Sequence, residues 1–143
     1  MIENTHLINF KEHGGEYGSL VALEGKRDIP FQVRRVYYIY DVEPTCRRGF
    51  HSHNDLEQVL ICLHGSVKIL VKTPFEEEIV ELNSRTHGLY IGPMVWREMY
   101  DWQDEAVLLV LASEYYTEND YIRDYAKYET AAKRFFEERG RVK

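Results

Sequence analysis

His51 and His53 are separated by one residue, Ser52, in a segment with the character of a β-strand. Residues i and i+2 of a strand point to the same face, so the two imidazoles share one face. If that face lines a small barrel, two groups that titrate near neutrality meet in one concave site. Such a pair suits either metal ligation or proton transfer beside a carbonyl group, and the spacing alone leaves both open.

The elements that must hold this pair are mostly strands. Apolar and alternating stretches bounded by Gly and Pro cover residues 19–23, 33–41, 57–63, 66–72, 77–81, 88–91 and 106–112, with turns expected at 64–66 and 72–74. From Asn119 onward, aromatic and apolar residues recur at helical spacing. We therefore expect one all-β domain over residues 1–143, with a small barrel at about 5–113 and one or two α-helices at about 117–139.

Composition excludes several classes of function. The net charge of −6 argues against a nucleic-acid-binding protein, which needs a surplus of Lys and Arg on one face. No stretch approaches the length of apolar sequence that spans a bilayer, and the N-terminus lacks a signal peptide, so a soluble cytoplasmic protein without a membrane partner is expected. Cys46 and Cys62 form no CxxC pair and are expected to be free thiols.

The stretch around the histidines, with Gly65, Gly88 and the turn Gly92-Pro93 that follow it, resembles the two signature motifs of the cupin superfamily. The resemblance implies a jelly-roll-like barrel. In metal-binding cupins it also implies a third His after the Gly-Pro turn, and this chain has Arg97 there. Because a protonated arginine cannot ligate a metal, we expect no metal, and Glu57 could instead orient one imidazole. The alternative without chemistry is a pair of buried, hydrogen-bonded histidines.

A closer resemblance covers nearly the whole chain. It rests on Gly18-Ser19-Leu20-Val21-Ala22, Pro30-Phe31, Arg34-Arg35-Val36-Tyr37-Tyr38, Arg48-Gly49-Phe50-His51, Leu56-Glu57-Gln58, Gly92-Pro93-Met94-Val95-Trp96 and Leu111-Ala112-Ser113-Glu114-Tyr115-Tyr116. These segments resemble the sugar-nucleotide 3,4-ketoisomerases that act on dTDP-4-keto-6-deoxy-D-glucose. The resemblance implies a homodimer that uses no metal or other cofactor. It also implies a 3-keto product for 3-amino-3,6-dideoxyhexoses of lipopolysaccharide or S-layer glycans.

The chemistry of the residues and the family resemblance together predict the site residues. A neutral imidazole is a suitable base for the C3 proton beside the C4 ketone, and the family motif implies that His51 takes this role while His53 serves the oxygens. Tyr37 and Tyr17 are the other catalytic candidates. The candidates for binding the diphosphate, sugar or base are Arg35, Arg48, Glu57, Lys72, Trp96, Arg97 and Tyr100.

One departure bears on the product. Where these enzymes have Arg-Gly before the Ser-Leu pair, this chain has Tyr17-Gly18. A residue over one face of the sugar could decide the face on which C4 is reprotonated, and we favour the gluco-like over the galacto-like product. The rival functions are a 3,5-epimerase of the same substrate, a metal-dependent dioxygenase-type cupin and a non-catalytic nucleotide-sugar-binding cupin. The segment 7–10 is expected to supply an exchanged edge strand in the homodimer.

Overall fold

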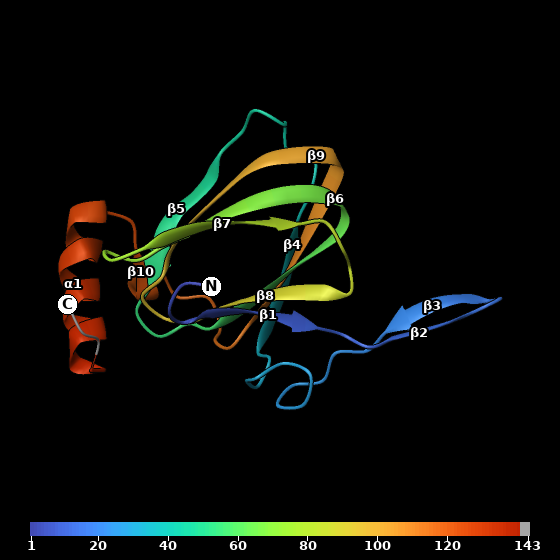
Figure 1. Ribbon diagram of the computed structural model, residues 1–143, viewed down its shortest axis with the longest axis horizontal. Helices are drawn as coiled ribbons and strands as arrows, with labels where there is room; N and C mark the ends of the chain where they lie inside the picture. Colours follow the sequence, from blue (N-terminus) through green and yellow to red (C-terminus); the bar gives the residue numbers. More distant parts are fainter. Residues whose placement is uncertain (141–143) are drawn as a thin grey trace.

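One curled antiparallel sheet dominates the structure, a computed structural model that describes residues 1–140 of the chain. Its strands lie in the order β1-β8-β6-β9-β5-β10, with β4 paired to β9 and β7 paired to β6 (Figure 1). Their bounds are β1 Thr5–Asn9, β4 Arg35–Ile39, β5 Arg48–His53, β6 Gln58–Lys72, β7 Glu77–Leu82, β8 His87–Ile91, β9 Trp96–Ala112 and β10 Tyr121–Ile122. The prediction of a mostly β fold with C-terminal helical structure is confirmed.

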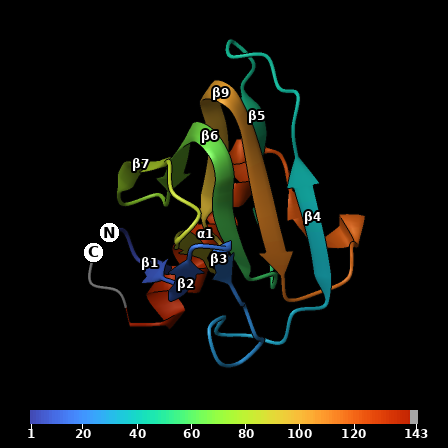
Figure 2. The same ribbon diagram turned by 90° about the vertical axis from the view of Figure 1, so that its right-hand side faces the viewer.

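The curl of the sheet comes from its two longest strands, β6 and β9. They pair with each other from Gln58–Ala112 to Lys72–Trp96, with register shifts between Cys62 and Lys68. At one end β6 also pairs with β8 and at the other with β7, while β9 pairs with β4 at one end and with β5 at the other. Each long strand therefore curves from one side of the curled sheet to the other, which gives the sheet the shape of a half-barrel (Figure 2).

The turn predicted at residues 64–66 is wrong. The chain continues through His64, Gly65 and Ser66 as one strand, and bulges accommodate the turn-like residues without ending it. Gly65 has a φ of 69°, and a Cβ there would overlap the carbonyl oxygen of Gln103 on β9. A glycine that reads as a turn signal in the sequence thus serves a sharp bend and a close approach between two paired strands.

The core lies inside the curled sheet and is closed at one side by the helix α1, Tyr125–Glu138. Asp124 caps the helix N-terminus by accepting a hydrogen bond from the backbone N–H of Lys127. The face of α1 that carries Tyr128, Ala132 and Phe136 is fully buried against the sheet. The Tyr128 hydroxyl lies 2.9 Å from the carbonyl of Met94, in the loop before β9, and 3.0 Å from the carbonyl of Lys72, the last residue of β6, so it links the helix to both.

The start of the helical segment differs from the prediction. Residues 118–120 form a single 3-10 turn, and Tyr121 and Ile122 then pair with His53 and Ser52 as strand β10. The helix begins only at Tyr125. Pairing with β5 overrides the local helical spacing, because it satisfies backbone groups beside a buried strand.

A separate hairpin extends away from the sheet (Figure 1). It consists of β2 (Glu12–Gly15) and β3 (Gly18–Val21), and Tyr17 at its turn is 96% exposed. The preceding strand β1 pairs along its whole length with β8 of the same chain. Exchange of the segment 7–10 in a homodimer stays a prediction. Both cysteines are free thiols, as predicted. No helix within residues 1–140 is long and apolar enough to cross a membrane.

Candidate active site

The two histidines share one face of β5, as their spacing predicts. Their rings stand edge to face, with centroids 4.9 Å apart. The strand bulges between Gly49 and His51, where Gly49 has a φ of 94° and a Cβ would lie 2.9 Å from the carbonyl oxygen of Arg97. This close approach, which requires glycine, positions His51 opposite Arg97 on β9.

His51 lies on the wall of a cavity of about 420 Å³. We call it the histidine cavity; its walls come from β4, β5, β9, β10 and the residue after β10, and they comprise Arg35, Val36, Tyr37, Ile39, Arg48, Gly49, His51, Met99, Tyr121 and Arg123. His53 is not among them and is only 1% exposed. The first histidine can therefore contact a ligand in the cavity, and the second lies behind it.

Charge in the histidine cavity is positive. Three of its ten wall residues, Arg35, Arg48 and Arg123, are arginines, and none is a carboxylate. Glu118 nevertheless lies close by and accepts a hydrogen bond from Arg123 Nε at 2.9 Å. Arginine binds phosphate oxygens through paired N–H donors, so the wall suits a diphosphate.

Both histidines are neutral at physiological pH. Burial and, after it, the charge of Arg97 lower the pKa of His51 to about 3, and the same two causes lower the pKa of His53. A neutral imidazole has a lone pair and can act as a base. The low pKa keeps the lone pair of His51 free of a bound proton at neutral pH, and it also makes this imidazole a weaker base than an exposed one.

Arg97 lies in the interior, 1% exposed, rather than in the cavity. Its Nε and Nη2 donate to the carbonyl of Val95, and its Nη1 donates to Oε1 of Gln58. Gln58 in turn donates from Nε2 to the hydroxyl oxygen of Tyr37 at 3.0 Å. Burial lowers the pKa of Arg97 to about 10, which still leaves it protonated at neutral pH. The residue at the expected position of a third metal ligand is thus a buried cation that organises its neighbours.

An acidic partner for the histidines is present, but it is not Glu57. Nδ1 of His53 lies 3.2 Å from Oδ2 of Asp120, whose carboxylate also accepts from the backbone N–H of Asp55 and Leu56. Because a carboxylate only accepts, this contact assigns the ring proton of His53 to Nδ1 and the lone pair to Nε2. Glu57 instead accepts a hydrogen bond from the Tyr90 hydroxyl at 2.7 Å.

Sequence reasoning missed Asp120, Tyr121 and Arg123. The Tyr121 ring centroid is 4.4 Å from that of His53 and 5.0 Å from that of His51, so it closes the cavity beside both. No spacing along the chain links these residues to the histidines, which precede them by about seventy positions. The adjacent aromatic and β-branched residues Tyr121 and Ile122 were a weak strand signal that the helical pattern around them concealed.

Several predicted site residues lie outside the histidine cavity. Lys72 and Trp96 both pack on Tyr125 of α1, with the Lys72 ammonium 4.7 Å from the ring centroid and the Trp96 centroid 5.0 Å away. Tyr100 lies under the guanidinium of Arg47, at 4.1 Å from its centroid. Tyr17 is at the exposed turn of the hairpin. Of the predicted residues, the single chain brings Arg35, Tyr37, Arg48 and His51 to the cavity wall.

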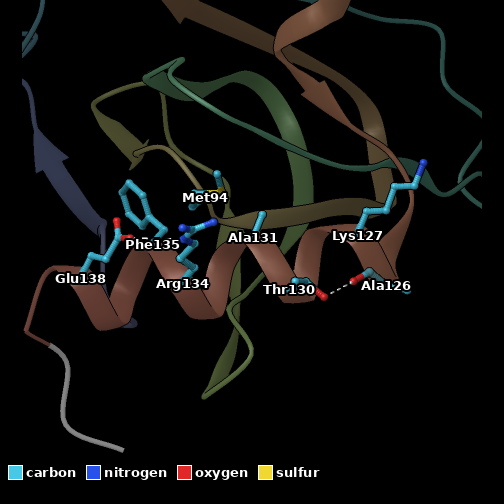
Figure 3. Close-up of a pocket in the computed structure, with 8 residues that line it drawn as sticks. All are labelled: Met94, Ala126, Lys127, Thr130, Ala131, Arg134, Phe135 and Glu138. Carbon is cyan, nitrogen blue, oxygen red and sulfur yellow. Dashed lines mark hydrogen bonds and ion pairs between the residues drawn. The ribbon is translucent and has the colours of Figure 1, made fainter.

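A larger hollow, of about 750 Å³, runs along α1 (Figure 3). Apolar side chains such as Met94, Ala131 and Phe135 line it together with Lys127, Arg134 and Glu138. Arg134 forms an ion pair with Glu138, with 3.3 Å between Nε and Oε1. The hollow contains no histidine and no buried titratable group, so size alone does not make it the reactive site.

Comparison with known proteins agrees with this geometry. Residues 3–133 match the family described as "FdtA: WxcM-like, C-terminal". A TDP-4-oxo-6-deoxy-alpha-D-glucose-3,4-oxoisomerase of Aneurinibacillus thermoaerophilus is 49% identical over 119 residues, which is 83% of this chain and 86% of the relative.

Solved structures give the same result. The 3,4-ketoisomerase QdtA of Thermoanaerobacterium thermosaccharolyticum, in complex with TDP, is 58% identical over 95% of this chain and 99% of its own, with a TM-score of 0.93. Structures of its H51N mutant with TDP-4-keto-6-deoxyglucose and of its Y17R/R97H double mutant with TDP match with a TM-score of 0.92. The TDP-quinovose 3,4-ketoisomerase WlaRB of Campylobacter jejuni is 43% identical over 90% of this chain and 99% of its own, with a TM-score of 0.87. The chain belongs to the WxcM-like C-terminal family, and it has the fold of these cupin-like ketoisomerases.

Proposed function

We infer that the chain is a sugar-nucleotide 3,4-ketoisomerase that converts TDP-4-keto-6-deoxyglucose into a TDP-3-keto-6-deoxyhexose. The observation that carries this conclusion is a neutral, partly accessible imidazole, His51, on the wall of a cavity lined by arginines, in a chain of this family. The arginines match the diphosphate, and the imidazole matches the acidic C–H bond beside a ketone.

The reaction needs one carbon base and one route for a hydroxyl proton. His51 takes the proton from C3, which the neighbouring C4 carbonyl acidifies; the C–H electrons form a C3=C4 double bond, and O4 takes up a proton to complete the enediol. Return of a proton to C4 and loss of the O3 proton leave the ketone at C3, with no net change in composition. His51 is the carbon base in this proposal because it alone of the two histidines lies on the cavity wall.

His53 is proposed to serve the oxygens. Its Nε2 is buried without a hydrogen-bond partner among the described residues, and its ring lies beside His51 and Tyr121. Asp120 is proposed to hold the ring with Nδ1 protonated, which keeps the Nε2 lone pair available. Tyr37 is the remaining candidate for contact with a sugar oxygen, because its side chain lines the cavity.

Arg35, Arg48 and Arg123 are proposed to bind the diphosphate. All three line the cavity, and Arg35 also lies over the rings of Tyr37 and Tyr116, at 5.3 and 5.6 Å from their centroids. Lys72, Trp96 and Tyr100 remain sequence predictions, since their contacts are with α1 and Arg47.

We propose a homodimer in which the hairpin of one subunit reaches the cavity of the other. An isolated two-stranded hairpin is only marginally stable in water, so this one needs packing against another surface. Its apolar side chains Leu20 and Tyr17 are 58% and 96% exposed in the single chain, and a second subunit could cover them. Tyr17 lies outside the histidine cavity of its own chain, so a role over the sugar requires a second copy. Light scattering should give about twice the chain mass of 17.0 kDa, and a monomeric mass would contradict this arrangement.

Subunit mixing tests the origin of Tyr17. A His51→Asn chain and a Tyr17→Ala chain should each be weakly active as homodimers. Random co-assembly should restore about a quarter of wild-type activity, because half the dimers are mixed and each mixed dimer has one complete site of two. No recovery would show that Tyr17 does not act across the dimer.

The proposed product is the gluco-like 3-keto sugar. This chain carries at positions 17 and 97 the Tyr and Arg that the double mutant of QdtA replaces together. Its relative WlaRB is named for quinovose, which is 6-deoxyglucose. Downstream use by an aminotransferase for 3-amino-3,6-dideoxyhexoses, and a cytoplasmic location, stay predictions.

Proton NMR of the reaction tests the function directly. With EDTA-treated enzyme in ordinary water, a 3-ketone with a large H4–H5 coupling identifies the gluco-like product, and a small coupling the galacto-like one. A parallel reaction in deuterated water locates exchange. Exchange confined to C3 and C4 supports ketoisomerisation, exchange at C5 indicates the 3,5-epimerase, and binding without turnover indicates a non-catalytic protein.

A further inference from the structure

Tyr37 has one hydrogen-bond partner within residues 1–140, and that partner is a donor. Gln58 Nε2 donates to the phenol oxygen at 3.0 Å, while the ring of Tyr37 lines the histidine cavity. A phenol oxygen that accepts a hydrogen bond still has its own O–H proton to donate. The direction of that proton therefore depends on which atom of the Gln58 amide faces it.

The orientation of this amide is determined by Arg97. Gln58 is 2% exposed and Arg97 1% exposed, so water does not compete for the contact between them. Arg97 Nη1 can only donate, and it therefore faces the amide oxygen, Oε1. Two further donors of Arg97 bind the Val95 carbonyl and hold the guanidinium in place. The amide nitrogen is left to face Tyr37, and the reverse orientation would set donor against donor.

The phenol proton of Tyr37 has no protein acceptor near it within residues 1–140. Within the described residues no acceptor lies at hydrogen-bond distance from the Tyr37 hydroxyl, and the cavity is the open direction. Burial, as the largest cause, raises the pKa of Tyr37, so the hydroxyl keeps its proton at neutral pH. An O–H group aimed into the cavity next to His51 can stabilise an oxygen that gains negative charge.

We propose that Gln58 is a positioning residue that, held by Arg97, directs the hydroxyl proton of Tyr37 into the cavity, where it donates a hydrogen bond to the sugar oxygen that becomes negatively charged as C3 is deprotonated. This role rests on the proposed ketoisomerase function. It adds a buried residue that contacts no substrate itself and acts through the group that does.

The test is Gln58→Glu. The carboxylate still accepts from Arg97 but now also accepts from Tyr37, so the phenol proton turns away from the cavity. We expect kcat to fall roughly 100- to 1,000-fold, the scale of losing one donor to a developing oxyanion, with KM within about twofold. The matched control is Gln32→Glu, because Gln32 also faces an arginine, Arg34, but on the exposed surface.

A double-mutant cycle separates positioning from a merely structural effect. If Gln58 acts through the phenol, Gln58→Glu causes no further loss of kcat in a Tyr37→Phe background. An equal loss in both backgrounds, or wild-type kcat for Gln58→Glu alone, would overturn the proposal. Should Gln58→Glu fold poorly, Gln58→Met is uncharged and enters the same cycle. Failure of the function itself is distinguishable, because the wild-type enzyme would then show no ketoisomerisation.

Discussion

Acid should leave the proposed carbon base, His51, largely unaffected. Burial and Arg97 lower the pKa of His51 to about 3, so at pH 5 roughly 99% of it is neutral, whereas an imidazole with a pKa of ~6.5 would be only about 3% neutral. We therefore expect kcat/KM at pH 5 to stay within about twofold of its value at pH 7. An unperturbed histidine base predicts a fall of roughly 25-fold.

The assay is kcat/KM between pH 5 and 8 at constant ionic strength, with short reaction times. The diphosphate of a sugar nucleotide is esterified at both ends and does not titrate in this range. A single proton step near pH 6.5 that reduces kcat/KM toward acid would refute the reasoning, because it would place the base at its ordinary pKa. His51→Asn measured alongside shows whether any residual activity follows another group.

The same pKa shifts should weaken the fold in acid. Each histidine has a folded pKa below its unfolded value, so the unfolded chain binds more protons and the stabilisation is present above pH ~6.5 and lost as pH falls. Between pH 7 and 5 the loss is about 2 kcal/mol for His51 and about 2 kcal/mol for His53. For a chain of this length, these losses lower Tm by roughly 13 °C.

Calorimetry at the two pH values measures this stability loss. The control is the double variant His51→Asn/His53→Asn, in which the pH dependence of Tm should be much shallower. An unchanged dependence would show that other groups, and not the buried pair, respond to acid.

Three substitutions extend the argument. Asp120→Asn should lower kcat about 10- to 100-fold, since an amide N–H facing Nδ1 of His53 favours the wrong tautomer; nitrogen NMR of the ring reads the tautomer, and Asp124→Asn is the control with normal kcat. Arg48→Ala should raise KM roughly tenfold with kcat within about twofold, because a charged hydrogen bond to phosphate is lost, and an unchanged KM in steady-state kinetics would place it outside the binding site. Tyr128→Phe should lower the free energy of unfolding by about 1–3 kcal/mol without changing kcat, since the one hydroxyl proton shared by the carbonyls of Lys72 and Met94 is lost, and a denaturant titration that shows no loss of stability would contradict this.

Much of the fold could be predicted, because strand periodicity is local. The alternation that defines most strands, the aromatic helix face and the shared face of His51 and His53 need no knowledge of distant residues. The predictions failed where pairing between distant segments overrode local signals. Gly65 indicates a turn when only its neighbours in sequence are considered, but it lies against β9 within a continuous strand. Residues 121–122 have helical spacing, but they pair with β5 as a strand.

Residue types and spacing alone predict the chemical groups of the site: two imidazoles on one strand face, arginines suited to phosphate, and Arg97 where a metal ligand would be expected. The tertiary structure was needed to show that His51 lines the cavity, that Asp120 is the carboxylate that contacts His53, and that burial lowers the pKa values of both histidines. Asp120 was out of reach of spacing arguments because its contact with His53 spans 67 residues. Desolvation and hydrogen-bond direction arise from the surrounding packed atoms, which belong to segments far apart in the chain.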